Sequence, residues 1–114
     1  MQAKDTIILI TNNGMGIGPE ELRLMLLSKY LQLLEQSGDL PSTICFYTEG
    51  VKLVTEGSPV LEQLGKLENK AVRLIACSTC LNYFGLKDKV KIGIAGSMAD
   101  ILEAQQKSVK VISL

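Results

Sequence analysis

The sequence predicts an α/β fold, a three-layer sandwich in which a five-stranded, mostly parallel sheet lies between two layers of helices. Three observations lead to this prediction. Short segments rich in β-branched and other apolar residues alternate along the 114-residue chain with segments whose apolar residues follow a helical spacing. The strand-like segments are largely apolar, which is typical of parallel strands buried on both faces. No linker, internal repeat or low-complexity tract interrupts this pattern, so residues 1–114 are expected to form one domain of βαβ units.

The first βα unit is predicted over residues 6–36. Residues 6–11 are β-branched or apolar and are expected to form a central strand, which ends at the glycine-rich turn of residues 12–18. Pro19 suits the first helical position, and the two glutamates after it suit the positive first turn of a helix that runs to about Gln36. The apolar residues of this helix cover more than a single stripe, so packing on the sheet and a subunit interface both remain open.

The second strand is predicted over residues 43–48, and residues 51–57 are expected to make about one helical turn. Ser58 is a good N-cap for the second helix, with Pro59 at its first position. Residues 72–76 are apolar and β-branched apart from one arginine, and they are expected to form the third strand.

The last two strands are predicted over residues 90–94 and 109–113, where valine and isoleucine recur. Ser97 and Asp100 resemble a capping box at the start of the helix between these strands. In such a box the N-cap hydroxyl and an acidic side chain three positions later each accept a hydrogen bond from the other residue's backbone N–H.

The composition excludes several classes of function. The 12 basic and 12 acidic residues balance and form no long run of one sign, which argues against a nucleic-acid or anionic-membrane surface. Histidine is absent, which excludes Cys–His and Ser–His–Asp catalysis and the common imidazole zinc sites, so neither a metal nor a cofactor is expected. No apolar run is long enough to span a bilayer, and the first five residues lack the apolar core of a signal peptide. Three cysteines without the density of a disulfide scaffold then favour a cytoplasmic, reduced protein.

The strongest chemical signal is the stretch Cys77-Ser78-Thr79-Cys80. It is expected at the carboxyl end of the third strand and in the first turn of a short helix that stops at Gly85. Backbone N–H groups and the helix dipole favour an anion at such a position. The pKa of Cys77 is therefore expected to fall, which would make its thiolate nucleophilic at neutral pH.

Four interpretations of this cysteine pair remain open. A structural zinc site needs four ligands, so two subunits would each have to contribute a pair. A thioredoxin-type dithiol usually follows the first strand of its unit, whereas this pair follows the third. The thiols could instead fill space beneath a helix, as Cys45 in the second strand is expected to do. In the fourth interpretation, one thiolate takes up sulfane sulfur as a persulfide and passes it to another thiol, without histidine or cofactor.

The turn Gly14-Met15-Gly16-Ile17-Gly18 follows a strand and opens a helix, as a dinucleotide fingerprint would. Its spacing is G-x-G-x-G rather than G-x-G-x-x-G, and no acidic residue ends the second strand, so a tight turn against a neighbouring loop is favoured over nucleotide binding. Met15 and Ile17 could line a pocket over the cysteines or contact another subunit.

Reactive sites in parallel sheets gather at the carboxyl ends of the strands, so the loops after the first three strands are expected to meet. The residues expected to line a pocket around the two cysteines are Gly14, Met15, Gly16, Glu49, Ser78 and Thr79.

The chain resembles the DsrE/DsrF-like family. The most specific stretches are Phe46-Tyr47 leading into residues 50–58, and residues 76–86 around the cysteine pair; Gly14-Met15-Gly16 followed by Glu21-Leu22 also looks like the first loop of the family. Within the family, the chain is very similar to the C-terminal domain of YedF-like proteins, described as sulfurtransferase-like proteins of selenium metabolism.

The resemblance implies that Cys77, which lies eight residues before Gly85, accepts the persulfide, and that Cys80 fills the second position of a C-x-T-C variant. Relatives often carry an arginine just before that glycine, where this chain has Phe84. The resemblance also implies a homotrimer or homohexamer. YedF-like proteins usually carry an N-terminal TusA-like domain as well, so three alternatives stay open: that domain has been lost, the sequence is part of a longer protein, or the chain works with a separate TusA-like sulfur-carrier partner. The resulting hypothesis is a sulfur-relay protein with sulfurtransferase activity. The alternative is a non-catalytic oligomeric binding or assembly subunit, in which the cysteines pack or bind metal.

Overall fold

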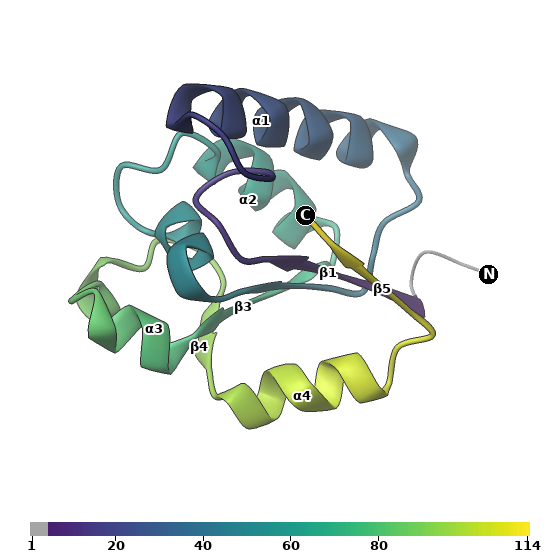
Figure 1. The fold of residues 1–114 in the computed structure, drawn as a ribbon. Coiled ribbons are helices and arrows are strands. Elements are labelled where there is room, and N and C mark those ends of the chain that lie inside the picture. Colours follow the sequence, from purple (N-terminus) through teal and green to yellow (C-terminus); the bar gives the residue numbers. More distant parts are fainter. Residues whose placement is uncertain (1–4) are drawn as a thin grey trace.

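The computed structural model describes residues 5–114, and these form a five-stranded sheet with helices on both faces (Figure 1). The sheet has the order β4-β3-β2-β1-β5, and every neighbouring pair is parallel. This confirms the predicted three-layer α/β architecture. The strands are β1 (Thr6–Ile10), β2 (Thr43–Phe46), β3 (Arg73–Cys77), β4 (Ile94–Gly96) and β5 (Lys110–Ser113).

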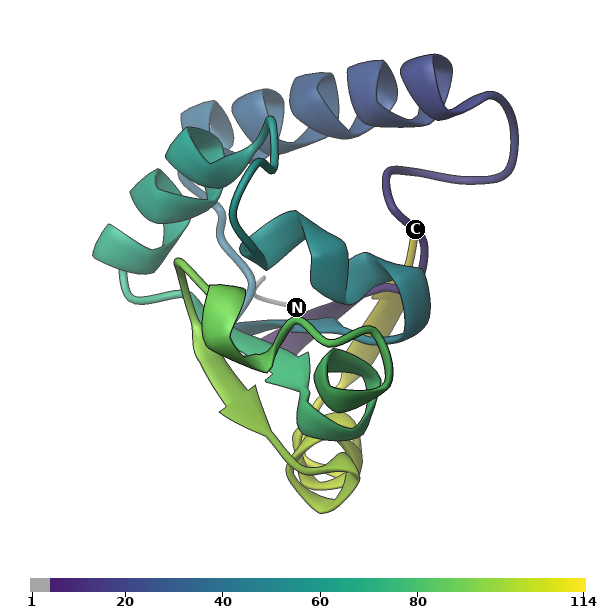
Figure 2. The same cartoon turned by 90° about the vertical axis from the view of Figure 1, so that its left-hand side faces the viewer.

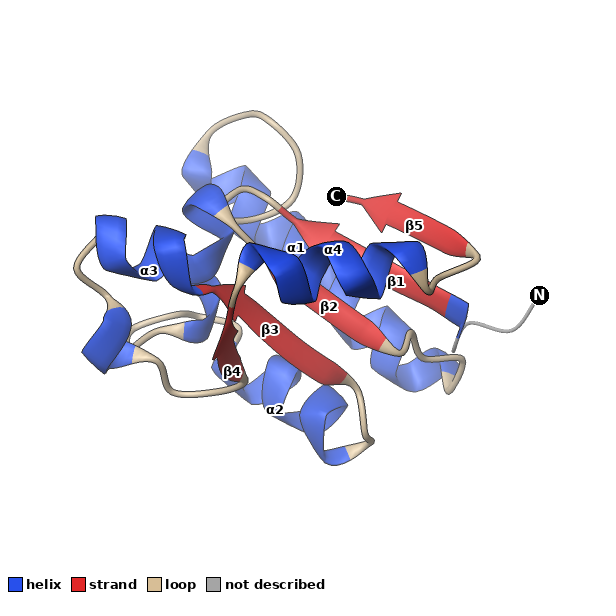
Figure 3. Ribbon diagram, turned by 90° about the horizontal axis from the view of Figure 1, so that it is seen from below, coloured by secondary structure: helices blue, strands red, loops and turns tan. Residues whose placement is uncertain are grey.

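The helices α1 and α2 pack side by side on one face of the sheet (Figure 1). The last helix, α4, crosses the opposite face and lies in front of the sheet in Figure 3. Between these layers, the 3₁₀ helix η2 and the short helix α3 contact each other at one edge of the sheet (Figure 2). The helical segments are α1 (Glu20–Ser37), η2 (Thr48–Val54), α2 (Leu61–Asn69), α3 (Ser78–Tyr83), η3 (Lys87–Lys89) and α4 (Met98–Gln106).

The core forms because β1, β2 and most of β3 bury their side chains on both faces of the sheet. Leu27 and Leu31 from α1 cover one face, and Ile101 from α4 covers the other. Each such aliphatic side chain contributes about 1.5–3 kcal/mol when it leaves water. The apolar strands that predicted a parallel sheet are thus the ones that hold the layers together.

Two predicted helix starts are wrong by one or two residues. Pro19 has a ψ of 143° and is the N-cap of α1 rather than its first helical residue. The second helix, α2, begins at Leu61 with Val60 as its N-cap, because Ser58 Oγ accepts a hydrogen bond from the Val60 N–H at 3.3 Å inside a turn that also contains Pro59. The predicted capping box of Ser97 and Asp100 is confirmed at the start of α4.

The fourth strand was predicted over residues 90–94, and this is wrong. Val90 instead forms an isolated antiparallel bridge with Thr55, and the Lys91 N–H donates to the Val54 carbonyl at 2.8 Å. Gly93 then turns the chain with a φ of 76°, so that β4 begins only at Ile94. Val90 and Lys91 therefore pair with the end of η2 and the residue after it. This tertiary contact cannot be predicted from the local pattern of apolar residues.

The second strand is two residues shorter than predicted, because the chain winds into η2 directly after Phe46 and Tyr47. Gly50 allows this, since a Cβ at that position would overlap the carbonyl group of Ile10 at the end of β1. The connection after β2 therefore lies against the end of β1.

No helix among residues 5–114 is long and apolar enough to cross a membrane. The expectation that the chain begins without a signal segment concerns mainly residues 1–4, which lie outside the described residues.

Candidate functional site

The connections that follow β1, β2 and β3 meet at the carboxyl edge of the sheet (Figure 2). They are the glycine-rich loop of residues 11–19, the 3₁₀ helix η2 and the helix α3. Because all of the strands are parallel, these three connections leave the sheet in the same direction. The loops after the first three strands therefore lie at the same end of the sheet, and the functional role of this place stays a prediction.

The glycine-rich loop is held mainly by Arg23 of α1. The Arg23 side chain donates to the carbonyl oxygens of Asn13 at 2.7 Å and Gly18 at 2.9 Å. A Cβ at Gly14 would overlap Arg23, and the Met15 N–H donates to the Arg23 carbonyl at 3.0 Å. The loop thus folds back onto its own helix. No motif in the sequence indicated this role of Arg23.

The two apolar side chains of the glycine-rich loop have different environments. Met15 is partly buried against the core, whereas Ile17 is fully exposed at 102 % of its reference area. Gly16 has a φ of 78° and open space where a Cβ would lie. Among residues 5–114, a Cβ at Gly14 would meet Arg23 and a Cβ at Gly16 would have no neighbour within 4 Å, so the predicted pocket role of these two glycines stays a prediction.

The two cysteines of the motif differ in access. Cys77 ends β3, acts as the N-cap of α3 and is completely buried. Cys80 follows in α3 and is half-buried, Ser78 is half-buried, and Thr79 is exposed. The thiol that reagents can reach from solvent is therefore that of Cys80. Cys77, at the start of α3, occupies the position where the sequence analysis expects an anion to be favoured, but it is buried.

The backbone N–H of Thr48 donates a hydrogen bond to Cys80 Sγ at 3.1 Å. Thr48 has a φ of 51°, a left-handed conformation that β-branched residues rarely adopt. Its hydroxyl donates to the carbonyl of Thr11 after β1 and contacts that of Tyr47. Backbone strain of this kind is commonest where a site needs a group in a fixed direction. Sequence analysis missed Thr48, because nothing in its neighbours signals a positive φ.

Burial raises the pKa of the Cys80 thiol, and the Thr48 N–H opposes this by stabilising the thiolate. The Cys77 thiol also raises the pKa of Cys80, and the two residues lie three positions apart at the start of α3. Cys45 is completely buried in β2, as expected for a core thiol; burial raises the pKa of Cys45 to about 11, and the charge of Arg73 lowers it slightly.

Besides the Thr48–Cys80 hydrogen bond, a second contact joins η2 to the end of α3, four residues after each of these two residues. Lys52 Nζ lies 4.8 Å from the centre of the Phe84 ring, and the Lys52 ammonium forms an ion pair with Glu49. The half-buried Glu49 carboxylate is thus paired rather than simply solvated. The ammonium group also places a positive charge against Phe84, close in sequence to Cys80.

Beside this second contact lies a cavity of about 490 Å³ between the start of α1 and the loop after η2. Lys52, Glu56 and Glu20 contribute charge to it, and Leu24, Phe84 and Leu86 contribute apolar surface. Of the residues predicted to line a pocket with the cysteines, none lines this cavity. Among residues 5–114, no three Cys, Asp or Glu side chains cluster as metal ligands would.

Comparison with known proteins places these features in a family. The model of the DsrE/DsrF-like family matches residues 7–114. No curated protein matches the chain.

Solved structures share the fold at low sequence identity. The ychN protein of E. coli has a TM-score of 0.72 at 19 % identity, with 100 % of both chains covered. The protein MTH1491 of Methanobacterium thermoautotrophicum, a protein of unknown function, has a TM-score of 0.71 at 20 % identity, covering 96 % of this chain and 97 % of its own. The protein BT1422 of Bacteroides thetaiotaomicron, also of unknown function, has a TM-score of 0.68 at 18 % identity, covering 100 % of this chain and 98 % of its own.

Proposed function

Since the chain belongs to the DsrE/DsrF-like family, we propose that it is a sulfur-relay protein that carries sulfane sulfur as a persulfide on its cysteine pair. The observation that carries this proposal is the hydrogen bond from the Thr48 N–H to Cys80 Sγ. It links the one accessible thiol of the pair to a fixed donor that favours the thiolate.

The two thiols have separate roles in the proposed relay. Cys80 is half-buried and receives sulfur first, whereas Cys77, which the family resemblance assigns as the acceptor, is buried and holds the persulfide away from water. Because the thiols are neighbours, sulfur can pass between them without a large movement of the chain.

Each step is an exchange of one S–S bond for another. The Cys80 thiolate attacks the terminal sulfur of a donor persulfide, R–S–SH; the donor S–S bond breaks, R–S⁻ leaves with the electron pair, and Cys80 becomes the persulfide. The Cys77 thiolate then attacks that terminal sulfur, and Cys80 regains its thiolate. No oxidant or reductant is consumed, and an acceptor thiol removes the sulfur by the same chemistry.

The proposal includes a homo-oligomer, a trimer or hexamer, which works in the cytoplasm with a TusA-like partner. Several large apolar side chains of α1 are exposed, and exposed apolar surface of this kind commonly marks an interface. The exposed apolar residues of α1 and its preceding loop are Ile17, Leu22, Met25, Leu26 and Leu33.

A second function is favoured by one observation, the complete burial of Cys77. A non-catalytic assembly or binding subunit would keep this thiol as a packing residue. The desolvation of Cys80, which raises the pKa of its own thiol, also suits such a subunit, because a thiol with a raised pKa is less reactive.

Intact-protein mass spectrometry separates the two functions. The reduced protein is mixed with glutathione persulfide, and samples are quenched with an alkylating reagent over time. The relay predicts a gain of one sulfur in the parent, an equal gain in the matched control Cys45→Ala, sulfur retained on Cys80 in Cys77→Ser, and much slower loading in Cys80→Ser. No gain in the parent would favour the assembly subunit. Equal rates in Cys80→Ser and the parent would show that sulfur reaches Cys77 directly.

A further inference from the structure

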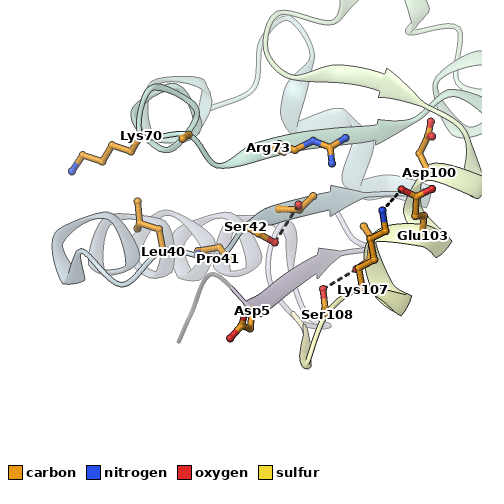
Figure 4. A pocket seen from close by; sticks show the side chains of 13 residues that line it. Asp5, Leu40, Pro41, Ser42, Lys70, Arg73, Asp100, Glu103, Lys107 and Ser108 are labelled. Carbon is orange, nitrogen blue, oxygen red and sulfur yellow. Dashed lines mark hydrogen bonds and ion pairs between the residues drawn. The ribbon is translucent and has the colours of Figure 1, made fainter. Parts of the chain in front are cut away.

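A cavity of about 590 Å³ opens at the amino ends of β1, β2 and β3, at the opposite end of these strands from the cysteine pair (Figure 4). β3 runs from Arg73 to Cys77, so the Arg73 end of the cavity lies about 13 Å along the strand from Cys77. The Asp100 end lies beside Gly96, which pairs with Cys77 in the sheet. The other wall of the cavity is α4. No cysteine lines the cavity.

The strand side of the cavity carries the positive charge of Arg73, and the carboxylate of Asp5, just before β1, lies at the far end of this wall and points away from Arg73 in Figure 4. Arg73 pairs with Thr43 in the register of β3 and β2, so both side chains lie on the same face of the sheet. Within residues 5–114, the Arg73 guanidinium makes no hydrogen bond or ion pair, and in Figure 4 it extends along the cavity toward the side formed by α4. Lys70 contributes little charge here, because it is paired with Glu35 at 3.4 Å and points away from the cavity in Figure 4.

Two hydroxyl groups accompany Arg73. Thr43 is only 4 % exposed, and its hydroxyl shares a long hydrogen bond of 3.4 Å with the neighbouring Ser42 hydroxyl. Ser42 Oγ also reaches the Thr6 carbonyl at 3.3 Å. Both hydroxyls line the cavity and keep bonding capacity for a ligand oxygen.

The α4 side of the cavity carries a negative charge. Glu103 and Lys107 form an ion pair at 2.9 Å and cancel each other. Asp100 accepts hydrogen bonds from the Ser97 N–H and hydroxyl, but no cation among residues 5–114 contacts its carboxylate. The cavity thus has the Arg73 guanidinium, which makes no ion pair, on one wall and the Asp100 carboxylate, which has no cationic partner, on the other, with Asp5 as a further carboxylate at the far end of the strand wall.

We propose that this cavity binds a small zwitterionic molecule of the amino-acid class, with its carboxylate on Arg73 and its ammonium group toward Asp100. The planar guanidinium can donate two parallel hydrogen bonds to a carboxylate. A dianion would leave one carboxylate facing Asp100, and a dication would leave one ammonium facing Arg73, so each meets a like charge. The volume suits a small organic ligand.

Three probes of the same length test the charge pattern: 5-aminopentanoate, glutarate and pentane-1,5-diamine. Calorimetric titration of the whole protein at low salt is expected to show saturable binding of 5-aminopentanoate, with glutarate and the diamine at least about tenfold weaker. Amide chemical shifts in NMR spectra should move at Ser42, Thr43 and Arg73. Absence of saturable binding of 5-aminopentanoate, or equal binding of glutarate, overturns the proposal.

Variants locate the site. Arg73→Gln should weaken the binding of 5-aminopentanoate at least about tenfold. Arg73→Lys keeps the charge but cannot donate two parallel hydrogen bonds, so its affinity for 5-aminopentanoate should lie between those of the parent and Arg73→Gln. The matched control Lys91→Gln removes an exposed lysine that does not line the cavity and should bind as the parent does. Unchanged binding in Arg73→Gln overturns the assignment. Thermal unfolding of each variant confirms that it is folded, and the comparison of the three probes on the parent does not depend on any variant.

Discussion

The backbone N–H of Thr48 donates to the sulfur of Cys80 across 32 residues of sequence, at a distance of 3.1 Å. The hydroxyl of Thr48 is bonded in turn to the carbonyl of Thr11 at the end of β1. The connections after three neighbouring strands are therefore linked through one residue in a left-handed conformation. The orientation of the Cys80 thiol depends on this residue more than on its own short helix.

Thr48→Val keeps the branched shape but removes the hydroxyl that anchors the strained backbone. We expect a loss of about 1 kcal/mol in the free energy of unfolding, measured in urea, and slower persulfide loading as the N–H loses its fixed direction. Thr79→Val is the matched control, because Thr79 is exposed beside the same cysteines, and it should change stability by less than about 0.5 kcal/mol. Equal effects of the two variants would contradict the role of Thr48.

Cys45 makes the stability depend on pH in the alkaline range. Burial raises the pKa of Cys45 to about 11, so the unfolded chain loses this proton at lower pH than the folded protein does. The stabilisation is complete below the unfolded pKa of about 9 and is lost as the pH rises toward about 11, by about 3 kcal/mol. Unfolding curves should show this loss in the parent and not in Cys45→Ala, after the titration of groups common to both has been subtracted. Parallel pH profiles would show that the Cys45 thiol ionises as easily in the folded protein.

Gly50 is required by the close approach of η2 to β1. A methyl group there would overlap the Ile10 carbonyl, so Gly50→Ala should cost at least about 2 kcal/mol and disturb the Thr48 to Cys80 contact. The matched control is Gly65→Ala inside α2, where a Cβ would lie 3.4 Å from Ile92 and alanine favours the helix. That variant should be neutral or more stable by up to about 1 kcal/mol. Chemical denaturation of both variants checks the difference.

The exposed apolar residues of α1 predict assembly through that helix. Met25→Glu places a charge on this surface and should shift the protein toward monomers in size-exclusion chromatography with light scattering. Lys29→Glu changes the charge of the same helix at an exposed polar position and should leave the assembly intact. If the assembly persists in Met25→Glu and is lost in Lys29→Glu, the interface depends on charged rather than apolar side chains.

The fold could be predicted from sequence because its signals are local. Apolar strands, the capping box at Ser97 and the glycine stop at Gly85 all follow from neighbouring residues. The fourth strand could not be placed, since Val90 pairs with Thr55, far from it in the chain.

The candidate site shows the same division. The motif predicts which cysteines form the site and that they lie at the carboxyl end of the sheet. Contacts between elements determine the rest: the burial of Cys77, the positive φ of Thr48, and the hydrogen bonds of Arg23 to the glycine-rich loop. The charge pattern around Arg73 also has no local signature, because β2, β3 and α4 each contribute only part of it.

The position of β1 between β2 and β5 has a consequence for how the protein folds. Only α1 and its connections separate β1 from β2 in the chain, so their pairing closes a short loop. The pairing of β1 with β5, such as Ile7 with Val111, joins segments from nearly opposite ends of the chain. Closing so long a loop costs entropy before its contacts form, and folding rates fall as contacts become more distant in sequence. We expect β1 to β4 to assemble first, with an open edge on β1 that pairs with β5 in the slowest step. In that interval the apolar edge of β1 is the segment most exposed to aggregation with other chains.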